Sequence, residues 1–189
     1  MTTVLRAGID VGSTTIKMAV LDENEQLVFH HYARHFADIP VAFDNLLSTL
    51  RATFGERSLA LTVTGSAGIG IAQRLGLPFV QEVIASTRAI RRYIPGTDTV
   101  IELGGEDAKI TYLSGVPEQR MNGVCAGGTG AFIDHMASLL NTDAGGLNEL
   151  AKDSTSIYPV ASRCGVFAKT DVQALMNDGV PRADIAASI

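Results

Sequence analysis

MNGVCAGGTGAFIDHM, residues 121–136, is the stretch around which this chain is organised. In it, Gly127, Gly128 and Gly130 follow Cys125 within five residues, and glycines adopt backbone angles that other residues avoid. The apolar residues that come next keep a helical period, so we expect a helix there. Because the first N–H groups of a helix attract anions, this helix start can hold a thiolate or a phosphate. The alternative is an ordinary glycine turn beside a buried cysteine.

The composition favours a folded cytoplasmic protein. Of the 189 residues, 46% are hydrophobic and 19% are charged, which is enough apolar material for a core. The formal net charge is −5 and Lys/Arg-rich runs are absent from the sequence, which argues against nucleic-acid binding. We find neither a signal peptide nor an apolar run of about 20 residues, so we expect no membrane association. Two cysteines are too few for a disulfide scaffold, and a cytosolic pair is more often metal-binding or catalytic.

The pattern of apolar residues predicts an α/β chain in two halves. In the first half we expect strands at 4–10, 15–21 and 26–32, a helix at 40–54, a strand at 58–64 and helices ending at 75 and 93. Short turns make the first three strands an antiparallel meander. In the second half we expect strands at 97–103, 108–113 and 115–120, a helix ending at 140, and helices at about 147–152 and 170–177. The Pro95-Gly96 pair places the boundary between residues 1–95 and residues 96–189.

The first glycine turn, Asp10-Val-Gly-Ser-Thr14, follows the first predicted strand. Its backbone N–H groups and the Ser13 and Thr14 hydroxyls can hold phosphate. Asp10, at the strand end, can hold Mg²⁺ through water, because Mg²⁺ keeps several of its waters in proteins. An ordinary β-hairpin turn is the alternative.

The second glycine turn, Glu102-Leu-Gly-Gly-Glu-Asp107, repeats this arrangement in the second half of the chain. In both segments an acidic residue is followed, two positions later, by a glycine: Ile9-Asp-Val-Gly-Ser in the first half and Ile101-Glu-Leu-Gly-Gly in the second. Two such turns suit two halves that close on one magnesium–nucleotide. Glu102 and Asp107 would then hold the metal or position a water molecule. A hairpin is again the alternative.

A third glycine-rich segment, Thr64-Gly-Ser-Ala-Gly-Ile-Gly70, follows a predicted strand and opens a helix, as a dinucleotide fingerprint does. Its spacing is one residue short of that fingerprint, and a βαβ unit with an acidic residue at its second strand does not follow. We therefore do not favour NAD binding.

The two cysteines, Cys125 and Cys164, lie 39 positions apart, each in a glycine-flanked loop. Two thiolates do not fill a zinc or iron–sulfur site, which commonly needs four ligands. A symmetric dimer would supply two more, and two unrelated buried cysteines are the alternative. The four histidines have no metal-ligand spacing with these cysteines, which argues against zinc.

Four segments resemble known motifs. Asp10 to Lys17 is similar to the first phosphate motif of the actin, hexokinase and heat-shock chaperone ATPases, and Ile101 to Lys109 to the second. Asn122 to Gly130 and Ser162 to Phe167 resemble the two cysteine segments of the ATPase activators of 2-hydroxyacyl-CoA dehydratases. Benzoyl-CoA reductase ATPase subunits belong to that same family. The four segments occur in the family's order and span nearly the whole chain.

The resemblance implies a ribonuclease-H-like, actin-like ATPase fold with two subdomains of mixed sheet flanked by helices. It implies ATP/ADP and Mg²⁺ in a cleft between them, with Asp10, Glu102 and Asp107 as catalytic carboxylates. The assigned nucleotide-binding residues are Gly12, Ser13, Thr14, Lys17, Gly104, Gly105, Gly127 and Gly128. Glu102 stands where the superfamily commonly has Asp. The superfamily's adenosine motif and closing helix are not found before Ile189, and the last predicted helix, after Pro181, is too short to stand alone. We therefore expect its partner elements to lie in a missing C-terminal part.

The resemblance further implies a homodimer that shares one 4Fe–4S cluster, held by Cys125 and Cys164 of each subunit. ATP hydrolysis would let the cluster pass a low-potential electron to a dehydratase or reductase, after reduction by a donor such as ferredoxin or flavodoxin. The stretch at 121–136 would then link the cluster to the nucleotide. Two alternatives stay open: a sugar or small-molecule kinase of the same superfamily, which has no use for the cysteine pair, and a non-catalytic ATPase-fold fragment of a larger fused protein.

Overall fold

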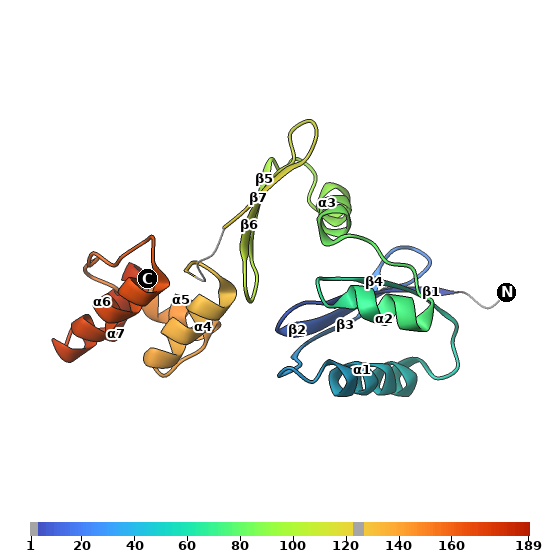
Figure 1. The fold of residues 1–189 in the computed structure, drawn as a ribbon, viewed down its shortest axis with the longest axis horizontal. Coiled ribbons are helices and arrows are strands. Elements are labelled where there is room, and N and C mark those ends of the chain that lie inside the picture. Colours follow the sequence, from blue (N-terminus) through green and yellow to red (C-terminus); the bar gives the residue numbers. More distant parts are fainter. Residues whose placement is uncertain (1–3, 123–126) are drawn as a thin grey trace. The chain divides into compact units, whose positions relative to one another are not determined.

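The computed structural model describes residues 4–122 and 127–189. The chain divides into two compact units, unit 1 (Met1–Thr97) and unit 2 (Asp98–Ile189), and each is described by itself (Figure 1). In the part of the chain that the structure describes, no helix is both long and apolar enough to cross a membrane.

Unit 1 is built on a four-stranded sheet with the strand order β3-β2-β1-β4. The strands are β1 (Leu5–Val11), β2 (Thr15–Leu21), β3 (Leu27–Arg34) and β4 (Leu59–Thr64). The first three form the predicted antiparallel meander. β4 pairs parallel to β1, so that Asp10 lies opposite Thr64. The carboxyl ends of β1 and β4 therefore lie side by side.

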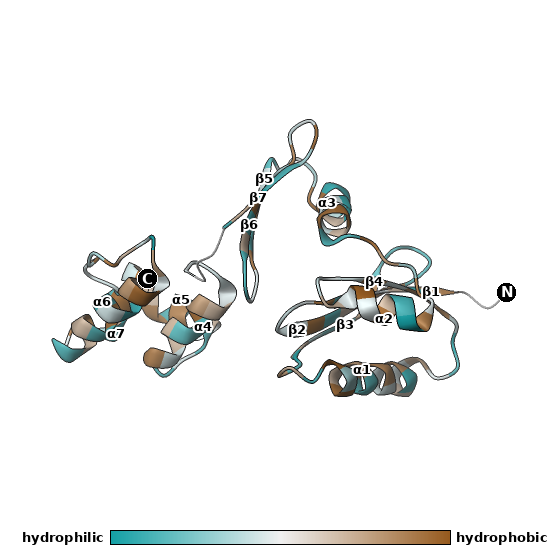
Figure 2. Ribbon diagram, viewed as in Figure 1, coloured by the Kyte–Doolittle hydropathy of each residue, from teal (hydrophilic) through white to brown (hydrophobic). Residues whose placement is uncertain are grey.

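Helix α1 (Ile39–Phe54) covers one face of this sheet. It begins at Asp38, whose side chain accepts the Val41 N–H at 3.2 Å, as helix N-caps commonly do. Figure 2 shows apolar residues interspersed with polar ones along α1, and the apolar set lies against alternate residues of β1 and β2. The buried residues of this core include Ile9, Val11, Ile16, Val20, Phe43, Leu46 and Leu50. The helices α2 (Gly68–Leu75) and α3 (Glu82–Tyr93) complete unit 1 as predicted.

Unit 2 begins with an antiparallel sheet in the order β5-β6-β7. The strands are β5 (Thr99–Leu103), β6 (Ala108–Tyr112) and β7 (Glu118–Met121). β7 begins three residues later than predicted, because Gly115, with φ of 71°, and Pro117 keep the chain in a turn. Four helices follow: α4 (Gly130–Leu139), α5 (Ala144–Ala151), α6 (Gly165–Asn177) and α7 (Arg182–Ser188).

Helices α4 to α7 share a core of their own. Its buried members include Met136, Leu140, Leu147, Val172 and Ile185. α7 lies within this core, packed on α5 and α6. We expected its partner elements to lie in a missing part of the chain, and that expectation is wrong.

Two helices of unit 2 begin earlier than the sequence pattern predicted. α5 begins at Ala144 because the Asp143 carboxylate accepts the Gly146 N–H at 2.7 Å. α6 begins at Gly165 because the Cys164 carbonyl already accepts the Ala168 N–H at 2.9 Å. Glycines near both starts look like helix breakers in the sequence. The side-chain cap of Asp143 stabilises the first turn of α5, whereas α6 begins without a side-chain cap.

Candidate nucleotide site and cysteine loop

The first glycine turn (residues 10–14) joins β1 to β2. Gly12 N–H donates to the Thr15 carbonyl oxygen at 2.9 Å and closes a tight hairpin. The sequence left a hairpin and a phosphate-binding turn as alternatives. The structure shows the hairpin, which leaves phosphate binding open because a hairpin turn can also present N–H groups to an anion.

His35, directly after β3, supports this turn. The backbone N–H of His35 donates to the Thr14 carbonyl oxygen at 3.2 Å, and the ring nitrogen Nε2 lies 3.1 Å from the Gly12 carbonyl oxygen. Ala37 N–H donates to Nδ1 at 3.2 Å, so Nε2 carries the proton and donates to Gly12. His35 is only 5% exposed. Sequence reasoning missed this residue, since its position becomes meaningful only once β3 is paired with β2.

A row of polar side chains crosses the sheet next to the turn. In the strand register, Lys17 of β2 lies opposite Asp10 of β1, which in turn lies opposite Thr64 of β4. Lys17 Nζ donates to Asp10 Oδ2 at 2.8 Å. The other carboxylate oxygen, Asp10 Oδ1, is buried and has no hydrogen-bond partner among the described residues, and the same holds for Thr64 Oγ1. Buried oxygens of this kind are sites at which a bound ion or water is expected.

Gly65 brings the end of β4 close to Asp10. Its φ is 92°, and a Cβ at this position would overlap Asp10 Oδ1 and the Val11 carbonyl oxygen. Ala67 N–H then donates to that Val11 carbonyl at 2.9 Å. The third glycine-rich segment (residues 64–70) therefore allows the ends of β1 and β4 to lie close together.

The second glycine turn (residues 102–107) joins β5 to β6 in unit 2. Gly104 N–H donates to the Asp107 carbonyl oxygen at 2.8 Å. The Asp107 carboxylate lies 3.5 Å from Lys109 Nζ, and the Lys109 side chain is only 13% exposed. Glu102 lies opposite Lys109 in the strand register. The two predicted carboxylates, Glu102 on β5 and Asp107 in the turn before β6, are therefore both placed beside the partly buried Lys109.

The start of α4 contacts the second glycine turn directly. Gly130 N–H donates to the Gly104 carbonyl oxygen at 2.7 Å. A Cβ on Gly130 would lie 2.8 Å from the Leu103 carbonyl oxygen, so this approach requires glycine. Thr129 is fully buried and caps α4 by accepting the Phe132 N–H at 3.2 Å.

The same loop contacts the second cysteine segment. Cys164, half-buried, is the N-cap residue of α6. A Cβ on the next residue, Gly165, would lie 3.3 Å from Gly127 Cα. A cavity of about 220 Å³ lies here, lined in part by Gly127, Gly128 and Cys164. Cys125, the other predicted metal ligand, lies outside the described residues.

The metal-binding groups of the described residues do not gather in one place. Within residues 4–122 and 127–189, no three His, Cys, Asp or Glu side chains are grouped so that they could hold a metal ion. The donor chemistry of Cys164 nevertheless fits an iron–sulfur cluster, because such clusters are held by cysteine thiolates. Val166 and Phe167, in the first turn of α6, are 72% and 65% exposed.

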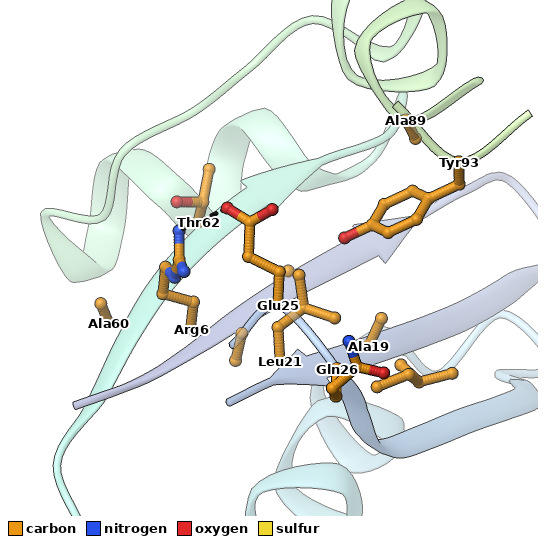
Figure 3. A pocket seen from close by; sticks show the side chains of 12 residues that line it. Arg6, Ala19, Leu21, Glu25, Gln26, Ala60, Thr62, Ala89 and Tyr93 are labelled. Atoms are coloured by element: carbon orange, nitrogen blue, oxygen red, sulfur yellow. Dashed lines mark hydrogen bonds and ion pairs between the residues drawn. The ribbon is translucent and has the colours of Figure 1, made fainter. Parts of the chain in front are cut away.

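A larger cavity of about 800 Å³ lies elsewhere in unit 1 (Figure 3). It includes Gly8 and Thr62 and reaches Tyr93 of α3, but none of the predicted site residues lines it. At its edge, Glu25 accepts from Arg92 at 2.8 Å and from Arg6 at 3.5 Å. The Arg92 guanidinium holds the pKa of Glu25 below its ordinary value. We place the candidate site at Asp10, where Lys17, Asp10 and Thr64 lie side by side on neighbouring strands, and not in this cavity.

Comparison with known proteins identifies the fold as the ribonuclease-H-like fold of actin-like ATPases, as the resemblance implied. The crystal structure of component A of (R)-2-hydroxyglutaryl-CoA dehydratase from Acidaminococcus fermentans superimposes with a TM-score of 0.86 at 26% identity, covering 98% of this chain and 73% of that chain. The activator of 2-hydroxyisocaproyl-CoA dehydratase from Clostridium difficile, solved with bound ADPNP, superimposes with a TM-score of 0.81 at 26% identity, covering 97% and 70%.

Sequence comparison agrees with the structural one. Residues 7–189 match the sequence model of the BadF/BadG/BcrA/BcrD ATPase family, and the chain belongs to that family. The (R)-2-hydroxyglutaryl-CoA dehydratase activating ATPase of Acidaminococcus fermentans is 28% identical over 185 residues, which are 96% of this chain and 71% of that protein.

Proposed function

We propose that this chain is an ATP-hydrolysing activator that passes a low-potential electron from a 4Fe–4S cluster to a 2-hydroxyacyl-CoA dehydratase or a related acyl-CoA reductase. The observation that carries the proposal is the hydrogen bond of 2.7 Å from Gly130 N–H to the Gly104 carbonyl. It joins the second glycine turn to the loop that bears Cys125. A nucleotide-dependent change in that turn therefore has a direct route to a predicted cluster ligand.

In this proposal each glycine turn contributes nucleotide-binding groups from its own unit. Mg²⁺ would neutralise the phosphate charge that develops in hydrolysis, and Asp10 fits it because its buried Oδ1 has no hydrogen-bond partner within residues 4–122 and 127–189. Lys17 orients the Asp10 carboxylate by donating a hydrogen bond to Oδ2 at 2.8 Å. The proposed phosphate-binding groups are Gly12, Ser13, Thr14, Gly104 and Gly105. Glu102 and Asp107 position the attacking water or the metal from the second turn.

The cluster is held by Cys125 and Cys164 of two chains. It supplies one-electron chemistry at low potential, which thiolate ligation favours. Val166 and Phe167 follow Cys164 in the first turn of α6 and are exposed; in this proposal the second chain covers them. A second copy of the chain at this surface would complete the set of four thiolates.

Coupling follows a short covalent and contact route. From Gly104 the route crosses to Gly130, then follows the chain back to Gly127, which lies against Gly165 and so beside Cys164. Gly128 lies on this route and has a φ of 79°, a backbone conformation that residues other than glycine rarely adopt. The proposed partner in electron transfer is a dehydratase, because the similar proteins are named as dehydratase activators. A reductase as the alternative partner, and a ferredoxin or flavodoxin as the electron donor, are what the resemblance of the cysteine segments implies.

The test is an absorption spectrum with iron and sulfide analysis after anaerobic reconstitution. We expect about one 4Fe–4S cluster per two chains, lost in both Cys125→Ala and Cys164→Ala, because each variant removes two of four thiolates. Ser162→Ala, in the same segment as Cys164, is the matched control and keeps the cluster. A folded protein that binds no iron would refute the electron-transfer function and favour a kinase of the same fold.

A further inference from the structure

Two oxygens beside the first glycine turn are chemically complementary and yet unbonded. Asp10 Oδ1 accepts hydrogen bonds, and the Thr64 hydroxyl can donate one. Both are buried, and neither has a partner among the described residues, not even the other. Buried polar atoms in native proteins are almost always satisfied by protein groups, water or ions. The pair therefore points to something held between them.

The strand register shows that the two side chains belong to one face of the sheet. Asp10 and Thr64 are direct partners in the parallel pairing of β1 and β4. The preceding residues, Ile9 and Val63, are fully buried, and Ile9 belongs to the core under α1. Because successive side chains of a strand point to opposite faces, Asp10 and Thr64 lie on the face away from α1.

The carboxylate is oriented so that its unbonded oxygen faces β4. Lys17 occupies Oδ2 from the β2 side at 2.8 Å. Oδ1 points toward the turn after β4, because a Cβ on Gly65 would overlap it. A water molecule between Oδ1 and the Thr64 hydroxyl would satisfy both groups, because it can donate one hydrogen bond to the carboxylate and the other to the hydroxyl oxygen.

We propose that Thr64 is a positioning residue of the nucleotide site, and that its hydroxyl and Asp10 Oδ1 together hold a water molecule that is a ligand of nucleotide-bound Mg²⁺. The inference rests on the proposed function, because it needs a magnesium–nucleotide at Asp10. Mg²⁺ retains several waters when it binds a protein, so residues often hold it through those waters. Thr64 then contributes to the binding of magnesium–nucleotide but not to the binding of nucleotide alone.

Thr64→Val tests this, since valine keeps the shape of threonine and removes the hydroxyl. Thr64→Ser keeps the hydroxyl. Thr62→Val is the matched control, because Thr62 lies two residues earlier on β4, opposite Gly8. The affinity for ADP is measured by calorimetry with MgCl₂ and with EDTA, and the melting temperature of each variant without ligand shows whether the fold is retained.

We expect Mg²⁺ to tighten ADP binding by the wild-type protein, and Thr64→Val to reduce that gain about tenfold, which corresponds to one lost hydrogen bond of ordinary strength. Its affinity in EDTA, and both affinities of Thr64→Ser and Thr62→Val, stay within about twofold of the wild type. If Thr64→Val keeps the full gain, or loses affinity equally with and without Mg²⁺, the inference is wrong while the proposed function stands. If the wild-type protein does not bind ADP, both are overturned.

Discussion

Units 1 and 2 contain the same short pattern in different environments. Ile9-Asp-Val in β1 and Ile101-Glu-Leu in β5 each precede a glycine turn. Ile9 and Val11 are fully buried, but Ile101 is 68% exposed and Leu103 49%. The alternation of apolar residues thus specifies which face of a strand is apolar, but it does not specify whether that face is covered.

The two glycine turns are also held differently. The first is fixed within unit 1 by His35 and by the close approach of Gly65. The second is held in unit 2 by Gly130, the first residue of α4. The first turn is therefore anchored to a packed sheet, whereas the second is anchored to the loop that precedes α4. This difference suits the first turn for binding and the second for communication.

The largest expected effect tests the difference in burial. Ile9→Ala removes buried methyl groups from the core under α1 and should lower the free energy of unfolding by about 2–5 kcal/mol. Ile101→Ala, at the equivalent exposed position, should change it by less than about 0.5 kcal/mol. Urea denaturation measures both. Equal losses would mean that the face of β5 is covered in solution.

The next prediction concerns communication through the second turn. Gly130→Ala places a Cβ 2.8 Å from the Leu103 carbonyl, so α4 must move away from the turn. In the wild-type protein we expect ATP to change the rate at which a chelator removes iron from the cluster. In Gly130→Ala this effect of ATP should be smaller by about tenfold or more, because the hydrogen bond from residue 130 to the Gly104 carbonyl is lost. Chelation is followed by absorbance with and without ATP.

Gly128→Ala sharpens this test, because its Cβ meets no atom within 4 Å but its φ of 79° is strained for alanine. We expect the effect of ATP on the chelation rate to fall by less than in Gly130→Ala, because alanine at this φ strains the loop by only about 1–2 kcal/mol. If both the ATPase rate and the ATP-dependent chelation are unchanged in Gly128→Ala and Gly130→Ala, the coupling route is wrong. Gly145→Ala, remote from the turn in α5, serves as the control.

The anchoring of the first turn is tested at His35. His35→Leu removes the hydrogen bond from His35 Nε2 to the Gly12 carbonyl oxygen. We expect the KM for ATP to rise about fivefold to tenfold, since one neutral hydrogen bond is worth about 1 kcal/mol. His35→Gln retains an N–H donor and should recover part of the loss. An unchanged KM in His35→Leu would show that the turn keeps its shape without this contact.

Much of this architecture could be predicted from the sequence, and the failures have physical causes. Local patterns indicated the meander, α1 and the two glycine turns, because turn residues and apolar periodicity are local signals. The roles of His35 and Thr64 depend on strand pairings that bring distant segments together, so no local pattern marks them. Thr64 and Gly65 lie in a glycine-rich motif whose spacing already argued against a dinucleotide, but only the strand register shows that Thr64 lies opposite Asp10.

A smaller effect is expected from pH in unit 2. Asp184 is 3% exposed, and its pKa is lowered first by the Thr155 N–H and then by the Ser156 N–H. A lowered pKa in the folded state means that the unfolded state binds more protons, so this stabilisation is present above about pH 4 and is lost as the pH falls through the folded pKa. Asp184→Asn should lower the melting temperature at pH 7 by several degrees and flatten its decline below pH 4. An unaltered pH profile would contradict the assignment.

The smallest effect is expected at Glu25 in unit 1, and it separates two ways of lowering a carboxyl pKa. Arg92 lowers the pKa of Glu25, so its contribution has the same sign as that of Asp184 and is also lost at acid pH. However, the side chains of Glu25 and Arg92 are 37% and 68% exposed, and exposed ion pairs are weak and screened by salt. Glu25→Gln should therefore lower the melting temperature by about a degree or less in dilute buffer, and this difference should vanish in 1 M NaCl. The effect of Asp184→Asn should persist in the same salt, because backbone N–H groups carry no net charge for salt to screen. Equal salt sensitivity of the two variants would mean that Asp184 too is stabilised by an ion pair.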